Sequence, residues 1–108
     1  MSDLAQKDCV PCRGGVPPLD AKRCAELLQQ VDGWAIEQGY HLTKTFKFPD
    51  FATALAFVNR VGAMAEKQGH HPDIHLGWGA VRVEIWTHKI DGLTENDFIF
   101  AAKTDECA

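Results

Sequence analysis

Histidines are concentrated in one short stretch of this sequence. Four of the five histidines lie between Glu66 and Lys89, in the segment EKQGHHPDIHLGWGAVRVEIWTHK. An imidazole can donate or accept a proton near neutral pH, and it can also bind zinc. We therefore expect the chemistry of the chain in this stretch, with His70, His71 and His88 as the candidate residues.

An apolar alternation predicts how the two halves of this stretch pair. If residues 79–80 form a two-residue turn, Leu76 faces Val83 and a consistent apolar face lies on the core. The same register places His71 opposite His88. It therefore predicts that the histidines converge at one end of the open face of a hairpin.

Three interpretations of this cluster stay open on spacing alone. Three imidazoles with an open fourth position are the ligand set of a catalytic zinc site. One protonated and one neutral imidazole can instead transfer protons. The third interpretation is that the histidines are surface or hydrogen-bonded residues without a chemical role.

The N-terminal segment carries a second pair of reactive side chains. Cys9 and Cys12 form the string CVPC, but a zinc site needs about four ligands, and this part of the chain offers no second pair with ligand spacing. The run PCRGGVPPLD that follows favours an extended arm, because it is rich in glycine and proline. We expect residues 1–18 to form that arm, with reduced thiols, and residues 19–108 to form a single domain.

Taken as a whole, the sequence predicts seven helices and strands. Asp20, Asp50 and Thr94 are expected N-caps of helices, and Gly69 is expected to end the second helix. In chain order the elements are a helix after Asp20, strands over residues 34–37 and 40–48, a helix to Gln68, the two strands of the histidine hairpin, and a last helix. The predicted fold class is α+β, a four-stranded antiparallel sheet with three helices on one face in the order α-β-β-α-β-β-α.

The expected helix over residues 50–68 is apolar on two sides. One stripe is expected to lie on the sheet and consists of Phe51, Ala54, Leu55, Val58 and Ala65. The second stripe consists of Phe57, Val61 and Met64. We expect it either to be covered by another subunit or to be wedged between the sheet and a neighbouring helix.

Composition limits the possible partners. A chain of 108 residues is one domain, and its net charge of -4 argues against a nonspecific grip on nucleic acid or anionic membrane. Asp3, Lys7 and Asp8 stand where a signal peptide needs an apolar run, and no stretch approaches the ~20 apolar residues of a membrane span. We therefore expect a cytoplasmic protein without nucleic-acid or membrane partners.

Several motifs together resemble the pterin-4a-carbinolamine dehydratase family. The strongest is EKxxHHP followed by a hairpin and TH, here at residues 66–72 and 87–88. Further matches are GW at 33–34, FKFPDF at 46–51 and GLTENDFIFA at 92–101. In the N-terminal segment, CRGG before PPL is similar to extensions of bacterial members. The resemblance covers everything except this arm.

The resemblance implies both a fold and an activity. Members of the family have one helix-covered antiparallel sheet and form dimers or tetramers. They dehydrate 4a-hydroxytetrahydropterin, which aromatic amino acid hydroxylases leave behind, to quinonoid dihydropterin, without metal or other cofactor. The resemblance thus favours proton transfer over metal binding, with a pterin as the small-molecule partner.

The resemblance also assigns roles to residues. His70, His71 and His88 are implied as catalytic: His70 and His88 as the proton-transfer pair, and His71 as the residue that binds or orients the hydroxyl and also aids transfer. The implied substrate-binding residues are Glu66, Pro72, Thr87 and Asp97.

Some of these residues have a structural explanation as well. Asp97 fits the N3 position of a capping box that begins at Thr94. Alternation turns the Thr87 side chain inward, so we expect a backbone contact with substrate there. His41 and His75 match no motif and are expected on the surface, whereas Trp86 is expected beside the pocket, where it could stack on a pterin.

The sequence departs from the family pattern in two places, before the histidine pair and around Thr87 and His88. Gly69 stands where some members carry an acidic residue, so no carboxylate is expected to act there. Trp86 and Lys89 flank Thr87 and His88 where other members have different polar residues. The specificity of the pocket is therefore not carried over.

A protein-interaction or regulatory role is the alternative function. Animal relatives bind and stabilise dimers of a homeodomain transcription factor through a helix surface. Phe57, Val61 and Met64 are expected to form that surface here. The intact set of three histidines favours the enzyme, because a regulatory or assembly protein has no physical need for all of them.

Overall fold

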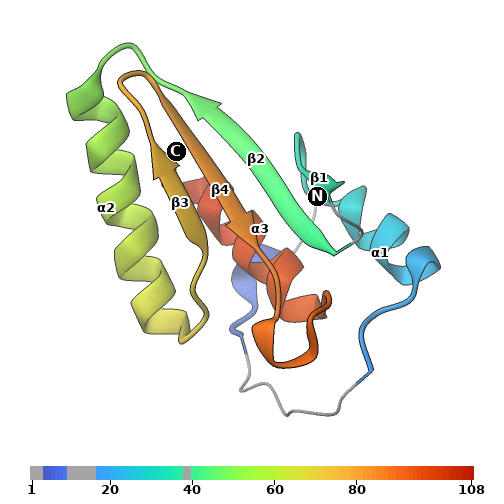
Figure 1. Ribbon diagram of the computed structural model, residues 1–108. Coiled ribbons are helices and arrows are strands. Elements are labelled where there is room, and N and C mark those ends of the chain that lie inside the picture. The colour runs from blue at the N-terminus through green and yellow to red at the C-terminus, as the bar shows by residue number, and fades with distance from the viewer. Residues whose placement is uncertain (1–3, 10–16, 38–39) are drawn as a thin grey trace.

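The computed structural model describes residues 4–9, 17–37 and 40–108 of the chain (Figure 1). Cys12 and the predicted turn at residues 38–39 lie outside the described residues. The elements are η1 (Leu4–Gln6), α1 (Ala21–Leu28), β1 (Ala35–Glu37), β2 (His41–Lys47), α2 (Phe51–Gln68), β3 (Asp73–Leu76), β4 (Ala80–Ile85), η2 (His88–Ile90) and α3 (Glu95–Cys107). The predicted order of helices and strands is confirmed, and η1 and η2 are short 3-10 helices.

The four strands form one antiparallel sheet in the order β1-β2-β4-β3. Figure 1 shows α3 behind the central strands β2 and β4, with α2 along the β3 side and α1 beyond β1. The core lies between the sheet and the helices, where Leu42, Val83, Ile85 and Phe98 are each 0% exposed. The predicted fold class is confirmed.

The helix ends follow the capping signals of the sequence. The Asp20 and Asp50 carboxylates each accept a hydrogen bond at 2.8 Å from the backbone N–H three residues on. Thr94 and Asp97 form the predicted capping box of α3. Gly69 ends α2 in the left-handed region, at φ 65°. This conformation suits glycine and turns the chain sharply before His70.

The predicted hairpin register is wrong by two residues. Leu76 pairs with Val81, and the Gly77 N–H donates to the Ala80 carbonyl at 2.8 Å, so the turn is Trp78 and Gly79. A shift of two residues keeps every side chain on the same face. The apolar pattern therefore predicted the face correctly but could not distinguish the two registers.

The predicted assignment of the two stripes on α2 is only partly right, because Ala54 and Ala65 of the first stripe are buried, at 0% and 2% exposed, but so is most of the second stripe. Phe57 and Val61, from the second stripe, are 0% exposed, whereas Phe51 and Leu55 are 44% and 39% exposed. The Phe57 ring packs on the rings of Phe46 and Phe48, at 4.7 and 5.1 Å between centroids. These contacts with β2 and the residue after it select the buried face, which periodicity alone left ambiguous. Phe57 and Val61 therefore cannot form an exposed interaction surface.

The described part of the N-terminal arm packs on the domain. Leu4 is 1% exposed and belongs to the core, and the Lys103 ammonium of α3 donates to the Ala5 carbonyl at 2.9 Å. Residues 4–9 are thus docked rather than extended. The division of the chain at residue 18 stays a prediction.

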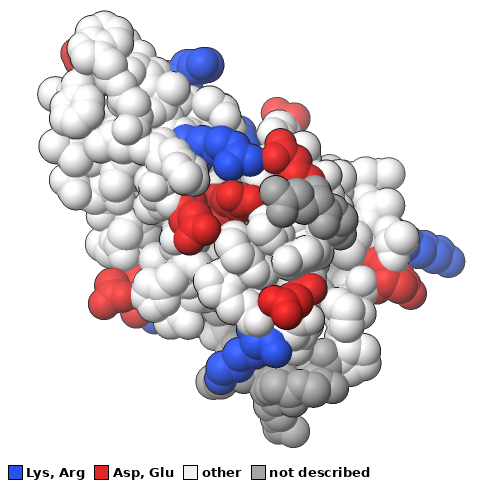
Figure 2. All heavy atoms as spheres, in the orientation of Figure 1, with Lys and Arg blue, Asp and Glu red and all other residues white. Residues whose placement is uncertain are grey.

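The helices and the surface charge of the described residues bear on possible membrane and charged partners. None of the helices among residues 4–9, 17–37 and 40–108 has the length and apolar character of a membrane span. Figure 2 shows acidic and basic side chains interspersed on the face in view, with an uncharged area over the start of α2 and the β3–β4 turn.

Candidate active site

A cavity of about 450 Å³ lies where the end of α2, the end of β4 and the start of α3 meet. Pockets for small molecules span about 300 to 1,000 Å³, so this one is large enough for a compact ligand. It is lined by Cys9, Gln68, Gly69, His70, His71, Trp86, Thr87, His88, Lys89 and Asn96.

His70 is held by a buried carboxylate. Its Nε2 lies 2.6 Å from Oδ1 of Asp97, which is 0% exposed. Because a carboxylate only accepts hydrogen bonds, Nε2 carries the proton, and Nδ1 is left for a ligand. The second oxygen, Oδ2, accepts from the Thr87 hydroxyl and the Thr94 N–H, both at 2.8 Å. Both oxygens of Asp97 are thus hydrogen-bonded, and the imidazole of His70 is fixed in orientation.

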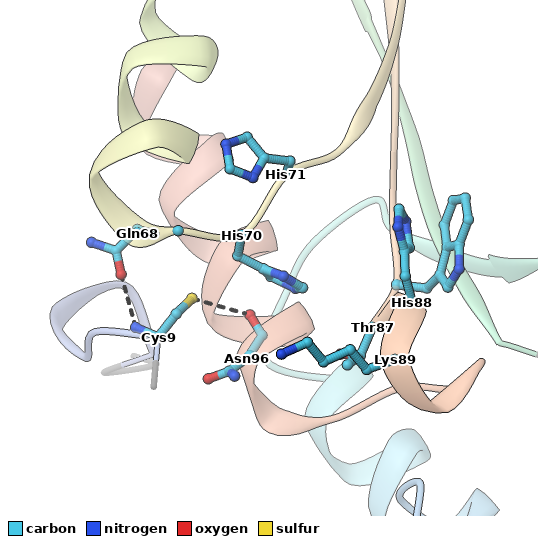
Figure 3. A pocket seen from close by; sticks show the side chains of 10 residues that line it. Cys9, Gln68, His70, His71, Thr87, His88, Lys89 and Asn96 are labelled. Carbon is cyan, nitrogen blue, oxygen red and sulfur yellow. Dashed lines mark hydrogen bonds between the residues drawn. The ribbon is translucent and has the colours of Figure 1, made fainter. Parts of the chain in front are cut away.

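His71 is arranged differently from its neighbour. Its Nε2 donates to Oε2 of Glu66 at 2.5 Å, and the two side chains are 58% and 78% exposed. Figure 3 shows the His71 ring turned toward α2, whereas the His70 ring points across the cavity toward His88. Glu66 therefore orients His71 from outside the cavity.

His88 stands beside two stacked rings. It begins η2, three residues after the end of β4, and its ring centroid lies 4.3 Å from that of Trp86. Trp86 in turn stacks on His41 at 3.8 Å, with an interplanar angle of 7°. The aromatic side of the cavity is thus backed by a histidine from β2.

The prediction that His41 lies on the surface is wrong. It is 7% exposed, and its Nδ1 lies 2.5 Å from Oε2 of Glu84 on the neighbouring strand β4. Burial raises the pKa of Glu84, but the hydrogen bond and charge of His41 and the charge of Arg82 outweigh burial and hold that pKa below its usual range. His75, by contrast, is exposed on β3, as expected.

The structure places the predicted site residues in two groups. His70, His71, Thr87 and His88 line the cavity. Asp97 lies behind His70, Glu66 lies beyond His71, and Pro72 precedes β3 without lining the cavity. Thr87 is 2% exposed, so its side chain is turned inward, as the alternation predicted.

Three lining residues were missed by the sequence interpretation. They are Cys9, Gln68 and Asn96. They come from three distant segments, and only Cys9 carried any signal, in the string CVPC. A helix-terminal glutamine or asparagine is ordinary, so the sequence offered no means of finding the other two.

The arrangement is suited to moving protons on a small molecule. His70 and His88 approach one space from opposite sides, and Trp86 adds an aromatic wall. Within the described part of the chain, no group of three or more His, Cys, Asp or Glu side chains is placed to hold a metal ion. Fold and site together define a small α+β protein with a histidine-lined ligand cavity, an arrangement suited to general acid–base chemistry.

Comparisons with known proteins identify the family. A family-wide sequence profile described as Pterin 4 alpha carbinolamine dehydratase matches residues 17–107. A relative from Rubrobacter xylanophilus, which carries the provisional name of a pterin-4-alpha-carbinolamine dehydratase, is 56% identical over 97% of this chain and 98% of its own. The chain belongs to the pterin-4a-carbinolamine dehydratase family, whose namesake activity is that of a hydro-lyase.

Two solved structures have the same fold. A transcriptional coactivator/pterin dehydratase from Brucella melitensis superposes with a TM-score of 0.80 and is 34% identical, over 85% of this chain and 99% of that one. A pterin dehydratase-like protein described as a RuBisCO assembly factor in the alpha-carboxysome superposes with a TM-score of 0.62 and is 29% identical, over 70% of this chain and 89% of that one. The family therefore includes proteins described by roles other than dehydration.

Proposed function

We propose that this protein dehydrates a 4a-hydroxytetrahydropterin to a quinonoid dihydropterin by histidine general acid–base catalysis. The observation that supports the proposal best is the His70 imidazole, which is fixed by buried Asp97 and points across the cavity toward His88. The reaction needs two proton transfers on one ring, and two imidazoles on opposite sides of a cavity can supply both.

The proton transfers follow from the tautomer of His70. With Nε2–H donated to Asp97, Nδ1 of a neutral His70 is a proton acceptor, and we assign it the proton of N5. The N5 electron pair then forms the C4a=N5 double bond, and the C4a–O bond breaks toward the oxygen. His88 donates a proton to that oxygen, which leaves as water. Asp97 stabilises the imidazolium that His70 becomes, as the carboxylate does in a catalytic triad.

The remaining predicted residues take supporting roles in this proposal. His71, oriented by Glu66, binds the departing hydroxyl at the rim. Thr87 presents its backbone to the substrate while its hydroxyl holds Asp97. Pro72 fixes the chain between His71 and β3. The indole of Trp86 packs between the rings of His41 and His88 and so positions His88.

The proposal also places the reaction in its chemical setting. The carbinolamine is the product of aromatic amino acid hydroxylases, so we propose that the protein works after such an enzyme and helps to regenerate tetrahydropterin. The side chains that we assign supply both proton transfers, and no metal or other cofactor has a step in this scheme. We propose a cytoplasmic location for it.

Self-association and a regulatory role form a second proposal, based on the outer face of α2. Phe51 and Leu55 are exposed there, and Trp78 is 69% exposed on the turn between β3 and β4. Figure 2 shows a mostly uncharged surface at this end of the molecule, with charged side chains only at its edges in this view. We propose that this apolar face joins copies into a dimer or tetramer, and that it would serve any coactivator or assembly role of the kind described for the relatives.

The test of the enzymatic proposal is the decay of freshly generated 4a-hydroxytetrahydropterin with and without the protein. We expect the wild type to accelerate dehydration, and His70→Ala and His88→Ala each to lose about 10²- to 10⁴-fold in kcat. His75→Ala is the matched control, because His75 is exposed on β3 outside the cavity. Absence of any acceleration by the wild type would contradict the proposal.

A further inference from the structure

The docked segment Leu4–Cys9 is attached to the domain along its length. Leu4 is buried in the core, the Ala5 carbonyl accepts from Lys103, and Lys7 forms an ion pair with Glu95 at 3.2 Å. The buried Leu4 is the strongest of these contacts, because exposed ion pairs contribute little to stability. The segment is thus part of the folded domain.

The end of this segment reaches the cavity. The Cys9 N–H donates to Oε1 of Gln68 at 2.8 Å, and the Cys9 thiol donates to the Asn96 carbonyl at 3.6 Å. Gln68 also donates from Nε2 to Oδ1 of Asp8 at 3.3 Å. Figure 3 shows Cys9 held between Gln68 and Asn96, on the side of the cavity away from His88.

Gln68 connects the segment to the histidines. It is the last residue of α2, and Gly69 and His70 follow it directly. Its side chain bonds two consecutive residues of the segment, Asp8 and Cys9. The hydrogen bond between Cys9 and Gln68 joins residues that are 59 positions apart in the sequence. It ties the N-terminal segment to the end of α2 at one edge of the cavity.

The Cys9 thiol is chemically quiet at neutral pH. Burial, with the negative charge of Asp97 as a smaller cause, raises the pKa of Cys9 to about 11. A thiol is a nucleophile or metal ligand only as the thiolate. Protonated and half-buried, Cys9 presents a small, polarizable surface suited to contact with a flat ring.

We propose that the segment Leu4–Cys9 is a fixed wall of the substrate cavity, in which Cys9 contacts the bound pterin and Gln68 is the positioning residue that holds the wall in place. The inference rests on the proposed function, since the pterin is the ligand that function requires. The wall contributes to substrate binding and takes no part in proton transfer.

The first experiment measures ligand contact without catalysis. In a Cys12→Ser background, Cys9 and Cys107 are labelled with N-ethylmaleimide at about pH 8.5, where more of each thiol is the reactive thiolate. Labelling is done in the presence and absence of a stable dihydropterin, and the rates are read by peptide mass spectrometry. We expect the dihydropterin to slow Cys9 labelling about tenfold or more, because alkylation requires access to the thiol. Cys107, at the opposite end of α3, is the internal control and should label at an unchanged rate. Unprotected Cys9, or equal slowing of both cysteines, would overturn the proposal.

The second experiment separates binding from catalysis. Gln68→Ala removes both hydrogen bonds to the segment, and Lys7→Ala removes only its exposed ion pair and serves as the matched control. We expect Gln68→Ala to raise KM about fivefold with kcat within about twofold of wild type, the pattern of lost uniform binding. A fall in kcat at unchanged KM, or no effect on either constant, would contradict a binding wall.

The two proposals can fail separately. If the wild type accelerates dehydration and His70→Ala abolishes it while Cys9 is unprotected, the wall is wrong and the proposed function stands. If equilibrium dialysis detects no dihydropterin bound to the wild type, the proposed function is contradicted, and the wall with it.

Discussion

Asp97 combines two tasks in one side chain. One oxygen accepts from the Thr94 backbone and begins α3, while the other fixes the His70 imidazole. The sequence suggested a capping role or a site role for this residue, and the geometry allows both at once. A carboxylate with no solvent exposure needs this many donors, because an unpaired charge in the interior is costly.

Replacing Asp97 by asparagine separates charge from shape. Asp97→Asn keeps the size of the side chain, but its NH2 group must face one of three donors. We expect kcat for dehydration to fall about 10²-fold, and the free energy of unfolding to fall by about 1 to 3 kcal/mol. Stopped-flow dehydration and urea unfolding measure the two effects. Glu95→Gln, in the same helical turn but exposed, should change neither, and an unchanged kcat for Asp97→Asn would refute the role of the carboxylate.

At the scale of elements, the pairing of β2 with β4 builds the support behind the cavity. His41 lies on β2, Glu84 on β4, and Trp86 and His88 follow the end of β4. The hydrogen bond of His41 to Glu84 and its stacking on Trp86 connect the middle of the sheet to the histidine at its end. The strand register therefore decides where His88 stands.

The low pKa of Glu84 predicts a dependence of stability on pH. Since the folded state holds this carboxyl below its ordinary pKa of 4.5, the unfolded state binds more protons as the pH falls through that range. The contribution of Glu84 to the free energy of unfolding is thus complete above about pH 4.5 and is lost progressively below it. Urea unfolding between about pH 3 and about pH 6 measures this effect. The free energy of unfolding of Glu84→Gln should fall less steeply with decreasing pH than that of the wild type. Glu26→Gln, exposed on α1, controls for the loss of one charge, and identical slopes for Glu84→Gln and wild type would contradict the linkage.

In the molecule as a whole, most apolar side chains form the packed core, but a few form an exposed face on α2. The core cluster runs from Leu4 at the N-terminal segment through the sheet to α3, so the docked segment and the elements around the cavity belong to one packed unit. Phe51 and Leu55 remain outside that unit on α2. An exposed apolar face next to an uncharged area is typical of a contact surface.

A charge on the outer face of α2 tests self-association. Leu55→Glu is expected to shift the protein toward the monomer, because burial of a carboxylate in an apolar interface is unfavourable. Size-exclusion chromatography with light scattering measures the mass, and Leu55→Met, which keeps the surface apolar, is the control. Dehydration by Leu55→Glu should remain, since the residue lies outside the cavity. An unchanged mass in Leu55→Glu would exclude this face as the interface.

The sequence by itself determined the three α-helices and four strands, their order and the location of the histidine cluster, but not the two 3-10 helices. Caps at Asp20, Asp50 and Thr94 and the stop at Gly69 depend on hydrogen bonds to residues within one turn, so local patterns are sufficient to predict them. The histidines needed no folding information to be noticed, because their density is a property of the sequence.

Only the tertiary structure decided which side chains meet. His70 bonds a residue 27 positions away, His41 one 43 positions away, and Cys9 one 59 positions away. Such contacts depend on strand order, on register and on which face of a helix is buried. Periodicity constrains these quantities only to within a repeat, as the two-residue shift of the hairpin and the burial of residues from both stripes of α2 show. Side chains from distant segments form the site, and only packing of the whole chain brings them together.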